Sequence, residues 1–133
     1  MHLQPHLLRK ELLQLDRQKQ IKFIVLFGSV AEGRANKLSD IDLAVYYGGT
    51  PDERFQFRKK ALGFLPQSID LHIFQDLPLA VRKEVLRGKL LYYQDFQFVF
   101  DEYMKVIREY DSFEKYQNEY VAALESARIT HGT

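Results

Sequence analysis

The stretch FGSVAEGRANKLSDIDLAVYY (Phe27–Tyr47) carries two aspartates, Asp40 and Asp42, at the start of an apolar run. Side chains alternate along a strand, so both carboxylates are predicted to lie on one face while the neighbouring apolar residues fill the core on the other. Their Cα atoms would be about 6–7 Å apart, and their oxygens could converge on one hard cation or a close pair. The alternatives are that arginine or lysine partners neutralise them, or that Asp40 only caps a turn.

A third acid occurs in the segment SIDLHIF (Ser68–Phe74), which again places an acid within an apolar strand. Asp70 and His72 share one face of this strand, and the apolar residues share the other. A carboxylate here would complete an oxygen-rich Mg²⁺ site together with the first two aspartates. We expect His72 to be a histidine of the core rather than part of this site.

A Gly-Ser pair, Gly28 and Ser29, ends the apolar segment IKFIVLF (Ile21–Phe27), which is predicted to be a strand buried on both faces. Glycine lets the backbone approach a ligand closely, and a hydroxyl or N–H group just beyond a strand suits an anion. We therefore predict that these two residues bind phosphate groups. Arg34 and Lys37, in the short loop or helical turn that follows, are weaker candidates for neutralising phosphate, because such residues commonly belong to a solvated loop.

The remaining periodicities predict one α/β domain in which helices surround a small sheet. We expect this domain to span 1–133, with a core at about 1–94 and a C-terminal helical segment at about 95–128. That segment is predicted to form one long helix, or two that break near Asp111. The other expected elements are helices ending near residue 17, starting at residue 51 and lying between residues 76 and 88, and strands at 40–47, 68–74 and 89–93.

Aromatic residues recur at helical spacing in the C-terminal segment. Four of its residues are expected to pack on the sheet as core: Phe96, Tyr103, Ile107 and Tyr110. The segment holds more tyrosine than one core face needs, and tyrosine is enriched at protein interfaces because it has an apolar body and a polar tip. We therefore predict that Tyr116 and Tyr120 lie at or near a partner surface.

Composition narrows the class of protein. The 133 residues contain no cysteine, which excludes disulfides, thiolate zinc sites and cysteine nucleophiles and agrees with a cytoplasmic protein. The net charge of +1 offers no basic groove of the kind that tracks a phosphate backbone, so no direct contact with nucleic acid is expected. No apolar run approaches the roughly 20 residues that span a bilayer, so no membrane association is expected.

A Gly-Ser pair, ten intervening residues and an Asp-Ile-Asp triplet (residues 28–42) resemble the signature of the polymerase-β-type nucleotidyltransferase superfamily. The string GSVAEGRANKLSDIDLAV is similar to the minimal members of that superfamily, the MNT-domain proteins. The acid in IDL at Asp70, the string VLRGKLLYYQD (Val85–Asp95) and the tyrosine-rich string REYDSFEKY are similar as well. Some relatives carry arginine at the positions of Val30 or Glu32, which leaves open which basic group meets the triphosphate here.

The resemblance implies a polymerase-β palm-like fold with a small mixed sheet, a C-terminal helical tail and all three acids at one edge of a cleft. It also implies transfer of a nucleoside monophosphate from a triphosphate, with ATP as the substrate and two Mg²⁺ ions as cofactors. Many minimal members are antitoxins that are thought to adenylylate a tyrosine of a partner HEPN-domain ribonuclease toxin. A HEPN toxin is therefore the expected partner.

These implications give the candidate residues specific roles. Asp40 and Asp42 are expected to bind Mg²⁺ ions that bridge the triphosphate, and Asp70 to ligate the second ion or to act as general base for the attacking hydroxyl. Gly28 and Ser29 would hold the β- and γ-phosphates. Three other functions stay open: neutralisation of a toxin by binding without catalysis, transfer to a small molecule such as an aminoglycoside, and modification of RNA.

Overall fold

The computed structural model describes residues 4–28 and 41–131, and its elements follow the predicted order. The C-terminal segment forms one continuous helix rather than two. The short turn or helix expected after Ser29 lies outside the described residues. The elements are α1 (Pro5–Leu15), β1 (Ile21–Phe27), β2 (Ile41–Tyr47), α2 (Pro51–Phe64), β3 (Ile69–Ile73), the 3₁₀ turn η1 (Phe74–Asp76), α3 (Leu79–Val85), β4 (Lys89–Tyr93) and α4 (Phe96–His131).

The described strands form one mixed sheet in the order β3-β2-β1-β4. The central strand β1 runs antiparallel to β2 and to β4, whereas β2 and β3 are parallel. Side chains of β1 enter two separate cores, one on each face, so the prediction of a strand buried on both faces is confirmed. The small mixed sheet flanked by helices is confirmed as well.

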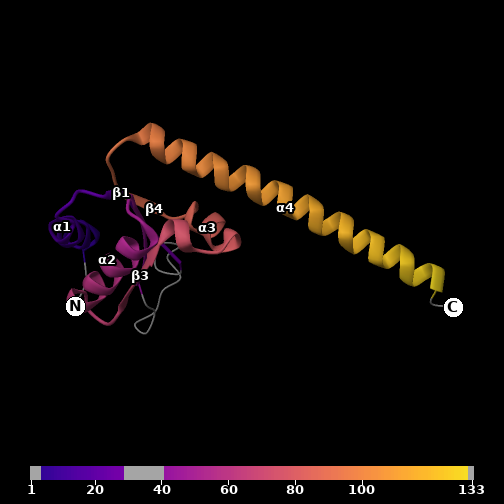
Figure 1. Cartoon of the computed structure of the whole chain (residues 1–133), viewed down its shortest axis with the longest axis horizontal. Helices are drawn as coiled ribbons and strands as arrows, with labels where there is room; N and C mark the ends of the chain where they lie inside the picture. The colour runs from indigo at the N-terminus through magenta and orange to yellow at the C-terminus, as the bar shows by residue number, and fades with distance from the viewer. Residues whose placement is uncertain (1–3, 29–40, 132–133) are drawn as a thin grey trace.

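Helices cover both faces of this sheet (Figure 1). On one face, Leu8 and Leu12 of α1 and Phe57 and Ala61 of α2 pack against the apolar side chains of β1, β2 and β3. The core of the other face combines β1 with η1, α3 and the first part of α4, through Phe23, Val25, Phe74, Val85, Val99 and Val106. The result is a sheet between two helical layers.

A buried carboxylate holds the turn between α1 and β1. Asp16 is buried, with its Oδ1 accepting a hydrogen bond from the Gln20 N–H at 2.9 Å. Its Oδ2 accepts a second bond from the Ile21 N–H at 2.8 Å. Both carboxylate oxygens are thus used, and together they set the residue at which β1 begins.

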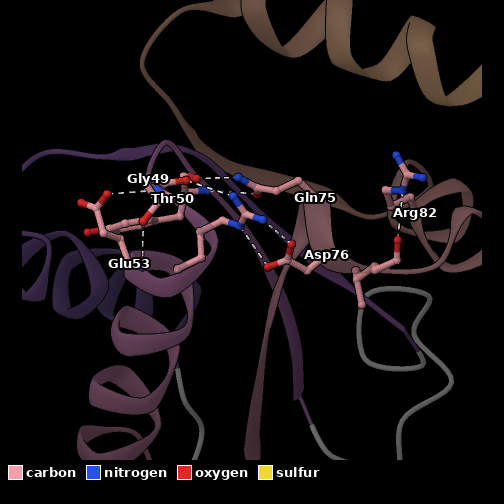
Figure 2. Close-up of polar contacts among 9 residues, drawn as sticks. Gly49, Thr50, Glu53, Gln75, Asp76 and Arg82 are labelled. Carbon is pink, nitrogen blue, oxygen red and sulfur yellow. Dashed lines mark hydrogen bonds and ion pairs between the residues drawn. The ribbon is translucent and has the colours of Figure 1, made fainter.

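Polar contacts also tie the start of α2 to η1, which follows β3 (Figure 2). Thr50 and Glu53 form a reciprocal capping box, in which the bond from the Thr50 N–H lowers the pKa of the Glu53 carboxyl. Arg54, on the first turn of α2, donates two hydrogen bonds to the Asp76 carboxylate, at 2.7 and 3.0 Å. The same guanidinium donates to the carbonyl of Gly49.

Next to these contacts, β2 continues beyond the end of β3, and there a side chain takes the place of the missing strand partner (Figure 2). The side-chain amide of Gln75 accepts from the Tyr47 N–H and donates to the Tyr47 carbonyl. Arg82 of α3 donates to the carbonyl of Leu77, just after η1. The Gln75 contacts hold the end of β3 beside β2, which matters for the site because β3 carries one of its acids.

Only the first part of α4 packs on the sheet. Val99 and Val106 are buried there with Tyr103 partly buried beside them, and burial raises the pKa of the Tyr103 hydroxyl to about 12. The prediction that Phe96 and Ile107 belong to the core is wrong, because they are 59% and 37% exposed. Ile107 directly follows the buried Val106 and lies outside the buried side of the helix. Phe96, on the first turn, contacts Tyr93 of β4 instead.

Beyond its contact with α3, the last helix projects from the body of the protein (Figure 1). Tyr110 packs on α3 rather than on the sheet, with the Lys83 ammonium 3.8 Å from its ring centre. All side chains at 111–127 are exposed. The helix has 36 residues, which makes it about 54 Å long. No helix in the described part of the chain is long and apolar enough to cross a membrane.

We expect Asp16→Ala to lower the free energy of unfolding by about 3 kcal/mol, because two backbone N–H groups lose their acceptor. Asp16→Asn keeps one carbonyl oxygen and should lose about half as much. Chemical denaturation of both variants and of the parent protein measures these differences. Equal stability of Asp16→Ala and the parent would show that water replaces both bonds.

Candidate active site

Two of the predicted site carboxylates lie side by side in the sheet. Asp42 of β2 is the register partner of Asp70 on β3, and on its other side it is the partner of Phe27, the last residue of β1. The residues that follow the two acids, Leu43 and Leu71, point into the core of the opposite face. Alternation thus places the carboxylates on one face, as the sequence predicts.

Gly28 follows β1 and brings the backbone against Asp42. Its φ of +86° lies in the left-handed region that glycine adopts readily. A Cβ atom at this position would be 2.6 Å from Asp42 Oδ2, so a larger residue would collide with the carboxylate. The glycine is therefore required by the position of Asp42, and the two residues form one structural unit.

His72 lies between the two carboxylates. Its Nε2 is 3.4 Å from Asp42 Oδ1 and 3.3 Å from Asp70 Oδ2. The side chain is 24% exposed, and its ring centre is 5.7 Å from that of Phe27. The expectation of a core histidine is therefore wrong. Because its neighbour on β2 is the small Ala44, the imidazole has room to reach the carboxylates instead of entering the core.

Arg58 of α2 is a cation near the site that sequence reasoning did not select. Its Nη2 is 3.8 Å from Asp70 Oδ1, and its Nε donates to the Leu71 carbonyl at 2.7 Å. Both charged groups are partly exposed, so the ion pair itself contributes little stability. Arg58 and His72, which both contact Asp70, also line a pocket of about 270 Å³. No sequence signal separates this arginine from the cations that follow it.

The other predicted site residues cannot be placed against these groups. They lie outside the described residues: Ser29, Arg34, Lys37 and Asp40. Their roles stay predictions, as do the catalytic roles of Asp42 and Asp70. The groups that the structure does bring together are Gly28, Asp42, Asp70 and His72, with Arg58 beside them.

Asp42, Asp70 and His72 fit a divalent cation. One donor atom from each side chain lies within 4.8 Å of the donor atoms of the other two, and all three residues are half-buried. Carboxylate oxygens are ligands for Mg²⁺ and Mn²⁺, and imidazole nitrogen is a ligand for first-row transition metals. A cation held here would offset the cost of placing two carboxylates next to each other.

Asp42 and Asp70 lie on neighbouring strands of a mixed sheet, beside the glycine that follows β1. This arrangement indicates a nucleotidyl-transfer domain. Residues 10–97 match the family model described as Polymerase beta, Nucleotidyltransferase. This match spans well over half of the chain, and the chain belongs to that family. No curated protein matches the chain significantly.

Solved structures share the fold. A chain from a crystal structure of a toxin–antitoxin with AMP-PNP has a TM-score of 0.67 and 22% identity, covering 87% of this chain and 97% of that chain. A chain from a complex of a tri-AMPylated Shewanella oneidensis HEPN toxin with an MNT antitoxin has a TM-score of 0.65 and 20% identity, covering 92% and 99%. A chain from the toxin–antitoxin MntA–HepT has a TM-score of 0.64 and 21% identity, covering 90% of this chain and 98% of that chain. The fold implied by the motif at residues 28–42 is confirmed.

We expect Gly28→Ala to lower stability by about 1–2 kcal/mol, because alanine disfavours a positive φ. The same change should weaken binding of a divalent cation about tenfold or more, because Asp42 must move away from the new methyl group. Thermal denaturation and calorimetric titration with Mn²⁺ measure the two effects.

Gly63→Ala is the matched control, because a Cβ there meets nothing within 4 Å. Gly63 lies inside α2, so alanine should raise stability by roughly 0.5–1 kcal/mol and leave cation binding unchanged. Normal cation binding by Gly28→Ala would contradict the assignment of Asp42 to the ion site.

Proposed function

We propose that this protein is an antitoxin that uses Mg²⁺ to transfer AMP from ATP to a hydroxyl group, that of a tyrosine, on a partner HEPN ribonuclease toxin. Family membership supports nucleotidyl transfer. The AMP donor and the acceptor are supported by two proteins of the same fold, one described with AMP-PNP and one with a tri-AMPylated HEPN toxin. For this chain, the pairing of Asp42 with Asp70 on neighbouring strands is the observation that carries the proposal.

In this proposal the three acids Asp40, Asp42 and Asp70 hold the metal. Bound as a pair, Mg²⁺ ions would neutralise the triphosphate and stabilise the charge that develops on the attacking and leaving oxygens. Gly28 contributes its backbone N–H and Ser29 its hydroxyl to the β- and γ-phosphates, at the end of β1. Arg34 and Lys37 add positive charge to the same groups.

The reaction is an in-line displacement at the α-phosphorus of ATP. The acceptor oxygen forms a bond to this phosphorus, and the bond to the oxygen that bridges the α- and β-phosphates breaks. Pyrophosphate leaves with that electron pair. The acceptor proton passes to the Asp70 carboxylate in its role as general base, or to solvent where Asp70 serves only as a ligand. In this proposal the acceptor enters through the pocket lined by His72 and Arg58, both of which contact the Asp70 carboxylate.

We expect Asp42→Asn to reduce AMP transfer at least a hundredfold or so, because it removes a charged metal ligand while keeping the shape of the side chain. The intact mass of the HEPN partner, measured after incubation with this protein, ATP and Mg²⁺, should rise by one or more AMP units with the parent and not with the variant. Asp52→Asn, an exposed acid on α2, is the control and should transfer normally. Full transfer by Asp42→Asn would contradict the proposed role.

A second candidate function is neutralisation by binding alone, for which the outer part of α4 offers a docking surface. Four residues there follow the spacing of one helix face and are 51–67% exposed: Phe113, Tyr116, Tyr120 and Leu124. We call this set the apolar stripe. It continues the side of the helix that packs on the body through Val99, Tyr103 and Val106. A helical toxin is a fitting occupant, since an uncovered helical stripe packs well on another helix.

The double variant Tyr116→Asp, Tyr120→Asp should weaken the complex with the HEPN partner by roughly a hundredfold, because charges in a desolvated interface cost more than truncation of a contact. Asn118→Asp, which adds a charge on the far side of the same exposed helix, should change the affinity less than threefold or so. Isothermal titration calorimetry measures both affinities. An equal loss of affinity in the double variant and in Asn118→Asp would indicate a general effect of charge. No loss of affinity in either variant would show that the apolar stripe lies outside the interface.

A further inference from the structure

We infer that His72 is a metal ligand of this site, whose nitrogen makes the site prefer Mn²⁺ to Mg²⁺. The inference deepens the proposed metal-dependent transfer and rests on it for the location of the ion. It goes beyond an all-carboxylate site, which the sequence alone predicts from its three aspartates. Its test needs neither nucleotide nor acceptor, so it can fail while the proposed transfer stands.

The distances around His72 fit a set of ligands around one ion. Nε2 lies 3.3 Å from Asp70 Oδ2 and 3.4 Å from Asp42 Oδ1, and the second contact is a long hydrogen bond when Nε2 carries the proton. When Nε2 is unprotonated, its lone pair is available to an ion between the two carboxylates. In an octahedral site with bonds of about 2.1–2.2 Å, adjacent ligands are about 3.0–3.1 Å apart and opposite ligands about 4.2–4.4 Å. The three donor atoms, all within 4.8 Å of one another, need only small movements to share an ion.

The pairing of β2 with β3 brings the donor atoms of Asp42, Asp70 and His72 close together. Asp70 and His72 are two residues apart on β3 and share a face, and Asp42 stands beside Asp70 on β2. The two oxygens of Asp70 face different groups, because Oδ1 is nearest to Arg58 and Oδ2 is nearest to His72. Arg58 is itself held by its bond to the Leu71 carbonyl, so it compensates one oxygen without competing for the other.

A nitrogen donor changes which ion the site favours. Mg²⁺ is a hard cation that binds oxygen and gives up its water reluctantly. Imidazole suits first-row transition metals, and sites that mix carboxylates with histidine hold di-iron and di-manganese centres in helical bundles. Mn²⁺ accepts carboxylate oxygens as Mg²⁺ does and imidazole nitrogen more readily, so of these two ions it matches all three donors better.

Pulsed electron paramagnetic resonance of the Mn²⁺-loaded, untagged full chain tests the inference directly. A nitrogen bound to Mn²⁺ modulates the electron spin echo at the ¹⁴N frequencies. We expect this modulation in the parent protein and in His6→Gln, an exposed histidine of α1, and its loss in His72→Gln. In calorimetric titrations His72→Gln should weaken Mn²⁺ binding about tenfold or more and Mg²⁺ binding much less.

Two results would overturn the inference. Bound Mn²⁺ that shows no nitrogen modulation in the parent protein would reduce His72 to a neighbour that orients the carboxylates, with the ion site and the proposed transfer intact. Equal weakening of Mn²⁺ and Mg²⁺ binding in His72→Gln would remove the preference. The echo measurement on the parent protein needs no substitution, so the test holds even if the variant folds poorly. Failure of the proposed transfer itself appears elsewhere, as an unchanged mass of the HEPN partner.

Discussion

The parallel pairing of β2 with β3 is the interaction on which the site depends. Its register sets Asp42 beside Asp70, and because side chains alternate along a strand, a slip of one residue would turn one of these acids into the core. Such a slip is opposed by apolar side chains on the opposite face, Leu43, Val45, Ile69, Leu71 and Ile73. At the end of β3, the contacts of Gln75 and of the Arg54–Asp76 pair hold the same register through polar groups.

The paired acids lie between a strand anchored in the core, β1, and a positively charged side chain, Arg58. The central strand β1, buried on both faces, ends at Phe27 and Gly28 next to Asp42, so the backbone that meets the carboxylate is anchored by the core. The Arg58 guanidinium lies near Asp70 and offsets part of the repulsion between the two acids. A site of this kind is half-buried, which strengthens electrostatic effects while a charged substrate can still enter.

Much of this arrangement could be predicted, because it follows from local alternation. The faces of Asp42 and Asp70 and the two-sided burial of β1 are properties of a few consecutive residues. A close backbone approach at Gly28 is predicted as well, but the contact with Asp42 that requires a glycine joins two elements. The failures concern contacts between elements. The approach of Arg58 depends on how α2 is turned relative to β3, and the position of His72 depends on the small residue beside it on β2. Periodicity likewise could not show where α4 leaves the sheet.

The length of α4 has a consequence for the local stability of the molecule. Helical stability in proteins comes mainly from packing, and an isolated helix shorter than roughly 12–15 residues is marginal in water. The outer part of α4, with its side chains exposed, therefore draws its order from the packed part rather than from contacts of its own. Its amides should exchange with solvent much faster than those near Val99 and Val106, in a gradient along one continuous helix. The affinity of a partner that covers this end would therefore be reduced by the free energy needed to order it.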